Sequence, residues 1–157
     1  MSLYKKHQEL LDRAIKALHE RTFWAAYEEH PSPKVYGETA DKDGQNAFKA
    51  HLNKNYEGLL QNNEGEFRGE EDSPYLGDAL NIKYPFSNSD KLVERAKSAF
   101  DVWRKVSVED RAGILIESLE RVKARFFEMA YATMHTTGQG YMMAFQASGP
   151  HGNDRAL

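Results

Sequence analysis

The sequence of 157 residues contains no cysteine. This absence removes disulfides, thiolate metal sites and a cysteine nucleophile from the chemistry that these residues can perform. Long apolar runs are also missing: none approaches the roughly 20 residues that span a bilayer, and the N-terminus lacks the apolar stretch of a signal peptide. We therefore expect a cytoplasmic protein without a membrane partner.

Basic residues are not in excess. Lysine and arginine total 21 against 24 acidic residues, which gives a formal net charge of -3 and a pI near 6.1. Nothing in this balance would neutralise a phosphate backbone, so nucleic acid is not an expected partner. Hydrophobic residues make up 40% of the chain and aromatic residues 11%. A packed core is feasible at this composition and length, and wholesale disorder is not expected.

Helical periodicity dominates the first part of the chain. The opening segment repeats apolar residues at helical spacing, with lysine and glutamate on the other face. Its stripe consists of Leu10, Leu11, Ala14, Ile15, Leu18 and Trp24. Pro31 and Pro33 end this pattern, because each pushes the preceding residue out of helical geometry. A shorter helix is predicted from Gln45 to Asn53, with Ala47, Phe48 and Leu52 facing inward.

Two further helices are predicted in the second half. Ser89 is a suitable N-cap for the first of them. Its apolar face consists of Leu92, Val93, Ala96, Ala99, Phe100 and Trp103. Ser107 opens the second, with acidic residues in its first turn that complement the helix dipole. The apolar repeat at spacings of three and four predicts one continuous helix over residues 108–135.

Extended structure is expected only between these helical parts. In "ALNIKYP", Leu80, Ile82 and Tyr84 alternate with polar residues, which predicts a half-buried strand ended by Pro85. The preceding stretch "NNEGEFRGEEDSPYLGD" is typical of a loop with one short extended piece around Phe67. The fold class is thus mainly α with a short β-strand or hairpin. We treat residues 1–157 as one unit: a helical segment (1–60), a loop with a short strand (61–88) and a second helical segment (89–157).

Gly138-Gln139-Gly140 is the feature closest to a phosphate-binding motif. A dinucleotide fingerprint needs a third glycine and a position between a strand and a helix, whereas this turn follows a long helix. Gly138 is therefore interpreted as the residue after the helix C-terminus, with positive φ. We expect Tyr141, Met142, Met143 and Phe145 to pack on a short helix. Gly149-Pro150 introduces another helix, for which Asn153 or Asp154 could serve as cap.

Titratable residues form no recognisable site. The histidines lack the i, i+4 spacing of a helical metal site and are expected to be structural or at the surface. They are His7, His19, His30, His51, His135 and His151. The acidic stretch from Glu64 to Asp72 lacks the alternating ligands of a calcium loop, and no serine stands in a Gly-x-Ser-x-Gly elbow. No catalytic, cofactor-binding or metal-binding residue is therefore predicted in this chain.

The order of these pieces resembles the aldehyde dehydrogenase superfamily. In "AFDVWRKVSVEDRAGILIESLERVKARFFEMAYATMHTTGQG", one helix ending in Ala-Phe-x-x-Trp is followed by a second helix and a closing Thr-Gly turn, as in the early helical pair of that superfamily. The matching residues are Ala99, Phe100, Trp103, Arg111, Ile114, Leu115 and Thr137-Gly138. The strand "LNIKYPFSNSD" occupies the place of the short strand before that pair. The implied fold is the N-terminal helical part of an α/β nucleotide-binding domain.

Two stretches resemble one branch, the PaaN-type proteins of phenylacetic acid degradation. These are "LLDRAIKALHERTFWAAYEEHPSPKVYGETA" and "MHTTGQGYMMAFQASGPHGNDRAL". The second departs from ordinary aldehyde dehydrogenases, which usually show Glu-Thr-Gly-Lys where this chain has His135-Thr136-Thr137-Gly138-Gln139. The resemblance implies an oxidoreductase that uses NAD or NADP, a cysteine nucleophile and a glutamate base. In that family these groups lie farther along than this chain reaches, so the chain itself is expected to be structural.

Two functional hypotheses follow from the resemblance and the composition. In the first, the chain is an apparently truncated N-terminal fragment whose helices pack against the rest of the parent polypeptide, or self-associate through exposed apolar faces. In the second, it is a stand-alone helical interaction module, and its exposed apolar stripes are binding surfaces.

Overall fold

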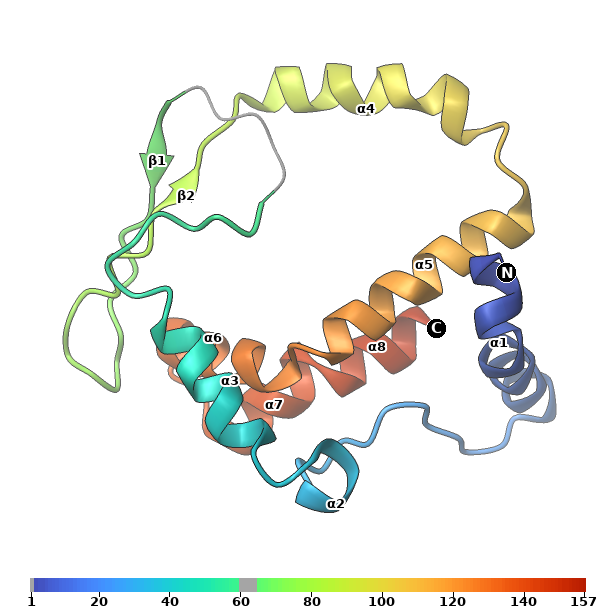
Figure 1. The fold of residues 1–157 in the computed structure, drawn as a ribbon, viewed down its shortest axis with the longest axis horizontal. Helices are drawn as coiled ribbons and strands as arrows, with labels where there is room; N and C mark the ends of the chain where they lie inside the picture. Colours follow the sequence, from blue (N-terminus) through green and yellow to red (C-terminus); the bar gives the residue numbers. More distant parts are fainter. Residues whose placement is uncertain (1, 60–64) are drawn as a thin grey trace.

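The structure, a computed structural model, describes residues 2–59 and 65–157. Helices, one short strand pair and their connections form a ring around an opening (Figure 1). The N-terminal helix and the last helix both lie near α5 on one side of this ring. Within the described part of the chain, no helix has the length and apolar character needed to cross a membrane. The class predicted from the sequence, mainly α with a short hairpin, is confirmed.

The first helix, α1 (Leu3–Glu20), is shorter than predicted. Arg21 adopts a left-handed conformation with φ 52°, and its N–H donates to the carbonyls of the last turn. The prediction that Trp24 continues the helical stripe was therefore wrong. Leu18 is 76% exposed, whereas Tyr27 in the following irregular stretch is 2% exposed. The buried aromatic side chain of this region, Tyr27, therefore comes from the irregular chain after α1. The helix itself buries only His7.

Two helices follow the proline-containing turn. The four-residue α2 (Pro33–Tyr36) begins with proline at its first position, where the missing N–H costs nothing. The next helix, α3 (Ala40–Lys49), starts five residues before the predicted Gln45 and ends before the predicted Asn53. Its inward face is as expected at Phe48, which is 2% exposed. Leu52 follows the helix and packs partly buried beside Phe48.

The strand pair is shorter than the sequence pattern suggests. β1 (Phe67–Arg68) and β2 (Tyr84–Pro85) pair antiparallel, with Phe67 opposite Pro85. The extended piece at Phe67 is confirmed, and β2 ends at Pro85 as predicted, with Pro85 itself as its last residue. The predicted strand at Leu80 and Ile82 is irregular backbone, although both side chains are buried as the alternation required. Glu64, the first residue of the predicted acidic loop, lies outside the described residues.

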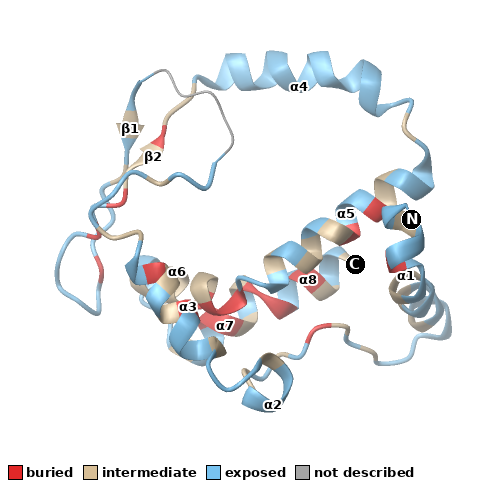
Figure 2. Cartoon of the chain, viewed as in Figure 1, coloured by how far each residue is buried: buried red, intermediate tan, exposed pale blue. Residues whose placement is uncertain are grey.

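Helix α4 (Ser89–Trp103) spans the far side of the ring from α3 and α6 (Figure 1). Its N-cap is Asn88, not the predicted Ser89: the Asn88 side chain accepts hydrogen bonds from the backbone N–H of Asp90 and Lys91. All fifteen residues of the helix are exposed. In Figure 2, α4 is coloured as exposed along its length, whereas α6 and α7 contain buried residues. The predicted apolar face therefore exists, but no described element packs extensively on it.

The long helix predicted over residues 108–135 is two helices, α5 (Val108–Lys123) and α6 (Phe126–Thr137). Ser107 caps α5 as predicted, accepting from the N–H of Asp110 at 3.0 Å. The break falls at Arg125, whose φ of -117° and ψ of 10° leave helical geometry. Apolar periodicity continues through this point, because Phe126 and Phe127 are both buried after the turn. Periodicity alone therefore could not reveal the break.

The last two helices are short. α7 (Tyr141–Ser148) and α8 (Pro150–Ala156) follow Gly138, which ends α6 with φ 77° as predicted. Met142 and Met143 are 42% and 58% exposed, so the prediction that these two pack was wrong. Phe145 is buried as predicted, Tyr141 packs partly buried against the core, and Ala144 is also buried. Asn153 and Asp154 are not caps, because α8 already begins at Pro150.

The core lies where α6 meets α7 and the stretch between α1 and α3. Phe126 and Phe145 are fully buried and meet edge to face with ring centroids 6.1 Å apart. Tyr27 and Tyr36 pack on Phe126 in the same manner. A smaller cluster of Phe48, Leu80 and Ile82 lies on the other side of α6. Helix α6 therefore contributes side chains to both hydrophobic clusters.

Candidate functional site

A cavity beside α6 is the best candidate for a ligand site. Its volume is about 290 Å³, at the small end of ligand pockets. Its lining comes from α3, the stretch after it, the segment before and including β2, and α6. The lining residues are Phe48, His51, Tyr56, Leu59, Ile82, Tyr84, Arg125, Glu128, Met129, Ala132 and Thr136. Most of this surface is aromatic or aliphatic, and the polar groups gather at one edge.

At that edge, Glu128 is held by three donors. Nε and Nη2 of Arg125 donate to its two oxygens at 2.8 and 2.5 Å, and Nε2 of His51 lies 2.8 Å from Oε1. Nη2 of Arg125 also donates to the hydroxyl of Tyr56. The hydrogen bonds from Arg125 lower the pKa of Glu128 against the opposing effect of burial. A carboxylate held charged in this way is a poor general base near neutral pH. The cluster instead joins His51, which follows α3, to Glu128 of α6.

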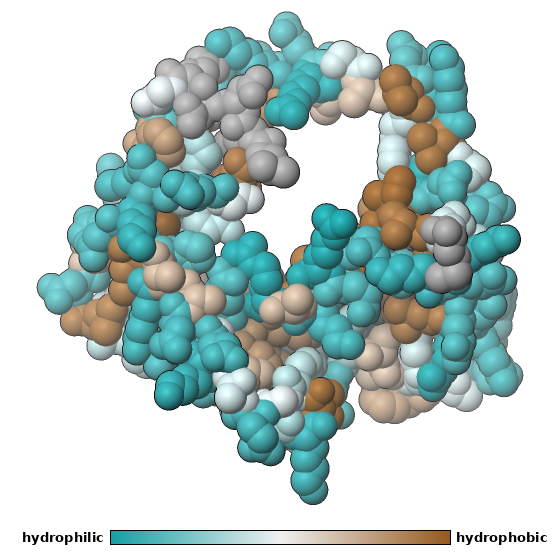
Figure 3. All heavy atoms as spheres, viewed as in Figure 1, coloured by the Kyte–Doolittle hydropathy of each residue, from teal (hydrophilic) through white to brown (hydrophobic). Residues whose placement is uncertain are grey.

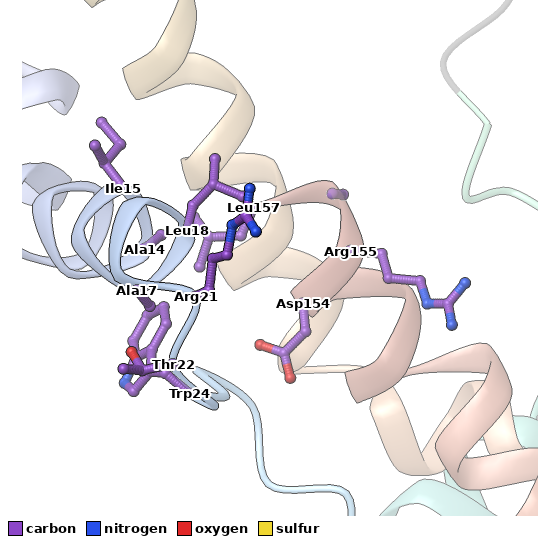
Figure 4. A pocket seen from close by; sticks show the side chains of 11 residues that line it. Ala14, Ile15, Ala17, Leu18, Arg21, Thr22, Trp24, Asp154, Arg155 and Leu157 are labelled. Carbon is purple, nitrogen blue, oxygen red and sulfur yellow. The ribbon is translucent and has the colours of Figure 1, made fainter.

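A second hollow, of about 600 Å³, lies between α1 and α8. Figure 4 shows the side chains that line it: Ala14, Ile15, Ala17, Leu18, Arg21, Thr22, Trp24, Asp154, Arg155 and Leu157. Asp154 Oδ1 accepts from the backbone N–H of Ala26 at 2.8 Å and of Tyr27 at 3.2 Å. Burial raises the pKa of Asp154, and these two donors oppose the rise. The carboxylate therefore anchors the N-terminal stretch onto α8.

Among the histidines, His7 and His135 contact polar side chains from distant parts of the chain. His7 is 7% exposed, and its Nε2 lies 2.7 Å from Glu117 of α5. Nδ1 of His135 lies 2.7 Å from the Ser73 hydroxyl, and its ring stacks on Phe48. No group of three or more histidine, aspartate or glutamate side chains is placed to hold a metal ion within residues 2–59 and 65–157.

The buried Ser73 is a residue that the sequence did not single out. Its Oγ accepts from the backbone N–H of Tyr75 and Leu76, at 3.2 and 3.1 Å, and its proton is then available to His135. A serine next to a histidine can be a nucleophile pair, but Ser73 is 2% exposed. The pair therefore fastens the 73–78 turn to α6. Only the turn-forming "SPYLGD" signalled it in the sequence.

The turn Gly138-Gln139-Gly140 does not fit a dinucleotide. It connects α6 to α7, and the fingerprint requires a strand before the glycines. Gly138 closes α6 by donating its N–H to the Met134 carbonyl. Tyr75 then donates its hydroxyl to the carbonyls of Gly138 and Gln139. These residues are engaged in joining two helices, so no step of nicotinamide chemistry can be assigned to them.

Comparison with known proteins shows what this arrangement is similar to. No protein-family model matches the sequence, and a search of curated proteins found no match. A solved structure does match: the crystal structure of an NAD-dependent aldehyde dehydrogenase from Burkholderia multivorans is 48% identical, with a TM-score of 0.91 over 99% of this chain. This chain spans 27% of that protein's length. The similarity supports the aldehyde dehydrogenase superfamily without distinguishing the PaaN branch, and the fold described above is similar to that of a fragment of an aldehyde dehydrogenase.

Proposed function

We propose that this chain is the N-terminal, structural portion of a cytoplasmic NAD- or NADP-dependent aldehyde dehydrogenase-like oxidoreductase of phenylacetic acid degradation. The observation that carries the proposal is the match to the Burkholderia enzyme, which extends over 99% of this chain at 48% identity. The NAD dependence of that enzyme favours NAD as the cofactor of the whole protein. The PaaN-like stretches at residues 10–40 and 134–157 support the assignment to phenylacetic acid degradation.

The residues of this chain support a structural role within such an enzyme. The sequence has no cysteine to form the covalent intermediate that the resemblance implies. Two of its partly buried carboxylates, Glu117 and Glu128, are held in ion pairs. Its Gly-x-Gly turn lies between helices. What the chain supplies is a helical frame, with a core at α6–α7 and the exposed helix α4 on the far side of the ring.

A chimera tests this function directly. The 157 residues replace the matching 27% of the Burkholderia enzyme, and NADH formation is followed at 340 nm with a panel of aldehydes. We expect turnover by the chimera and none by the 157-residue chain alone. Turnover by the chain alone would refute the structural role. A folded chimera without turnover on any aldehyde, beside an active parent enzyme, would refute the oxidoreductase assignment.

The assignment to phenylacetic acid degradation needs its own test. Disrupting the gene in the source organism should abolish or slow growth on phenylacetate as sole carbon source and leave growth on succinate unchanged. Equal growth on both carbon sources would remove this part of the proposal and leave the oxidoreductase assignment intact.

The exposed face of α4 also favours the second candidate, a helical interaction module. In that case the isolated chain would be a monomer that melts cooperatively and binds a separate protein. Sedimentation of the purified chain with and without a candidate protein distinguishes the two, since only the second candidate requires that a separate protein bind.

A further inference from the structure

The cavity beside α6 has walls suited to a small apolar molecule. Rings from three segments line it: Phe48 of α3, Tyr56 from the stretch after α3, and Tyr84 of β2. Met129 and Ala132 of α6 add aliphatic surface. Figure 3 shows that the opening inside the ring of helices persists when all heavy atoms are drawn, so that opening cannot enclose a small molecule. The cavity beside α6, by contrast, surrounds its contents with side chains from several elements.

The volume of the cavity sets the size of the ligand. An apolar cavity of about 150 Å³ inside a protein is large enough to bind benzene. The cavity beside α6 measures about 290 Å³. It therefore has room for one aromatic ring with a short substituent. Leu59 and Thr136 of its lining are exposed, so solvent reaches the cavity.

The tyrosine at the centre of the lining is held in place by its neighbours. The Tyr56 ring is tilted against the rings of His51 and Tyr84, with centroids 5.0 and 5.6 Å away. A Cβ added at Gly58 would lie 2.4 Å from the Tyr56 hydroxyl oxygen, so the Gly58 backbone lies directly against this side chain. Tilted and offset arrangements of aromatic rings are stabilising beyond the area that they bury. A further aromatic ring therefore has suitable partners in this wall.

One hydrogen-bond donor in the lining is available to a ligand. The hydroxyl oxygen of Tyr56 accepts from Nη2 of Arg125 at 3.1 Å. The hydroxyl proton of Tyr56 has no acceptor among the described residues. A hydroxyl whose oxygen is bound by a cation is a stronger donor, because successive hydrogen bonds polarise one another. The lining therefore offers a single directed O–H group to an acceptor such as a carbonyl oxygen.

The charges at the edge of the cavity are already paired. Arg125 donates to both oxygens of Glu128, and His51 lies on the same carboxylate. An anionic ligand would have to compete with Glu128 for Arg125, and a cationic ligand would be repelled by the guanidinium. Burying a charge without a partner is costly. The electrostatics of the cavity therefore favour an uncharged ligand.

We propose that the cavity beside α6 binds a small uncharged aromatic compound that carries one hydrogen-bond acceptor, with the Tyr56 hydroxyl donating to that acceptor. The ring of the ligand packs among Phe48, Tyr84 and Met129. Tyr56 thus selects ligands with an acceptor, and the Arg125–Glu128 pair selects against charged ones. The inference goes beyond the proposed function and does not depend on it, because every lining residue belongs to this chain and none is assigned a catalytic role.

NMR titration of the 157-residue chain tests the binding with three probes. Acetophenone carries the acceptor, α-methylstyrene has a CH₂ group in place of the carbonyl oxygen, and benzoate is charged. Acetophenone should show intermolecular NOEs to the methyl groups of Ile82, Met129 and Ala132. Benzoate should bind roughly tenfold or more weakly than acetophenone, because its charge finds no free partner. Absence of these NOEs at saturating acetophenone, or tighter binding of benzoate, would overturn the proposal.

A matched pair of substitutions tests the hydrogen bond. Tyr56→Phe keeps the ring and removes the donor, so it should weaken acetophenone binding by about threefold to tenfold and leave α-methylstyrene binding unchanged. The control is Tyr131→Phe, which removes a hydroxyl on α6 that donates to Asp41 and does not line the cavity. It should change the affinity for neither probe. Equal weakening of both probes by Tyr56→Phe would contradict the assigned role of Tyr56.

Filling the cavity tests its location. Ala132→Leu should abolish binding of both uncharged probes, whereas Ala96→Leu on the exposed helix α4 should leave it unchanged. Full binding by a folded Ala132→Leu variant would place the ligand elsewhere and refute the proposal. If that variant does not fold, the NOEs and Tyr56→Phe decide. In the folded chimera acetophenone should bind as it does in the chain. Loss of binding there would show that the remaining polypeptide occupies the cavity, which would also refute the proposal.

Discussion

Helices α4 and α6 are both amphipathic and similar in length, yet they differ in what covers their apolar residues. Phe126, Phe127 and Ala130 of α6 are each at most 8% exposed and contact residues of the N-terminal stretch, α2 and α7. Phe100 and Trp103 of α4 are 59% and 38% exposed. The same kind of sequence pattern thus produces a core in one region and an uncovered face in the other.

The difference shows that helical periodicity reports a tendency to be buried and does not identify the partner. Helix α6 has α3 and α7 beside it, whereas no helix or strand of the described residues packs extensively on α4. The stability of the isolated chain should therefore depend on α6 and hardly at all on α4. Four predictions test this contrast.

The largest effect is expected from emptying the core. Phe126→Ala removes a fully buried ring that meets Tyr27, Tyr36 and Phe145. It should reduce the free energy of unfolding by about 3–5 kcal/mol. The same substitution on α4, Phe100→Ala, should change it by less than about 0.5 kcal/mol. Urea unfolding of both variants decides the matter, and similar losses would show that α4 belongs to the folding unit.

A smaller effect is expected where α1 rests on α5. A Cβ added at Gly113 would lie 2.3 Å from the backbone nitrogen of Tyr4, so Gly113→Ala must push the two helices apart. The expected loss is about 1–3 kcal/mol. At Gly152 of α8 the nearest atom is 3.8 Å away, and Gly152→Ala should instead add about 0.5–1 kcal/mol through helix propensity. Thermal melts should show shifts of opposite sign.

Removing helix caps should separate the two regions more finely. Ser107→Ala deletes the acceptor for the N–H of Asp110 in α5, and should cost about 1 kcal/mol of global stability. Asn88→Ala deletes the equivalent acceptor in α4. Because α4 is not packed, losing this cap should lower the helicity measured by circular dichroism and leave the unfolding midpoint unchanged. A shifted midpoint for Asn88→Ala would contradict the independence of α4.

The smallest effect is expected from pH, through His135. Its ring faces Ser73, Tyr75, Phe48 and the charge of Lys49, and burial, followed by Lys49, lowers its pKa below 6.5. The unfolded chain then binds more protons, so the unfolding free energy should fall as pH drops below 6.5. His135→Asn should remove this part of the dependence. Subtracting urea data of the variant from those of the parent at pH 7.5 and 5.5 isolates it, and a zero difference would refute it.

Local chemistry made several features predictable from the sequence. Ser107 followed by Glu109 and Asp110 marked the start of α5, and Gly138 marked the end of α6. The division of residues 108–135 into two helices was not predictable, because Arg125 interrupts the backbone without interrupting the apolar repeat. Phe145 was predicted to pack and does, but Met142 and Met143 have equally suitable spacing, and only the packing of α7 on α6 shows that Ala144 is buried in their place.

The polar clusters were beyond sequence reasoning for a related reason. His51 and Glu128 are 77 residues apart, and His7 and Glu117 are 110 apart, so no spacing rule connects them. Their pairing follows from how α3 and α1 dock on α6 and α5. The absence of a cysteine nucleophile, by contrast, could be concluded at once, because a missing residue type needs no geometry.

The bond between Asp154 and the N–H groups of Ala26 and Tyr27 has a consequence for biosynthesis. These partners are 128 and 127 residues apart in the chain. A ribosome adding about 5–20 residues per second needs roughly 6–26 s to make the intervening segment. During that interval Tyr27 cannot complete its native environment, since Phe126 and Phe145 also arrive late. The aromatic segment around Tyr27 therefore stays exposed to solvent in the nascent chain during this interval. Exposed aromatic segments of this kind are the ones that chaperones bind.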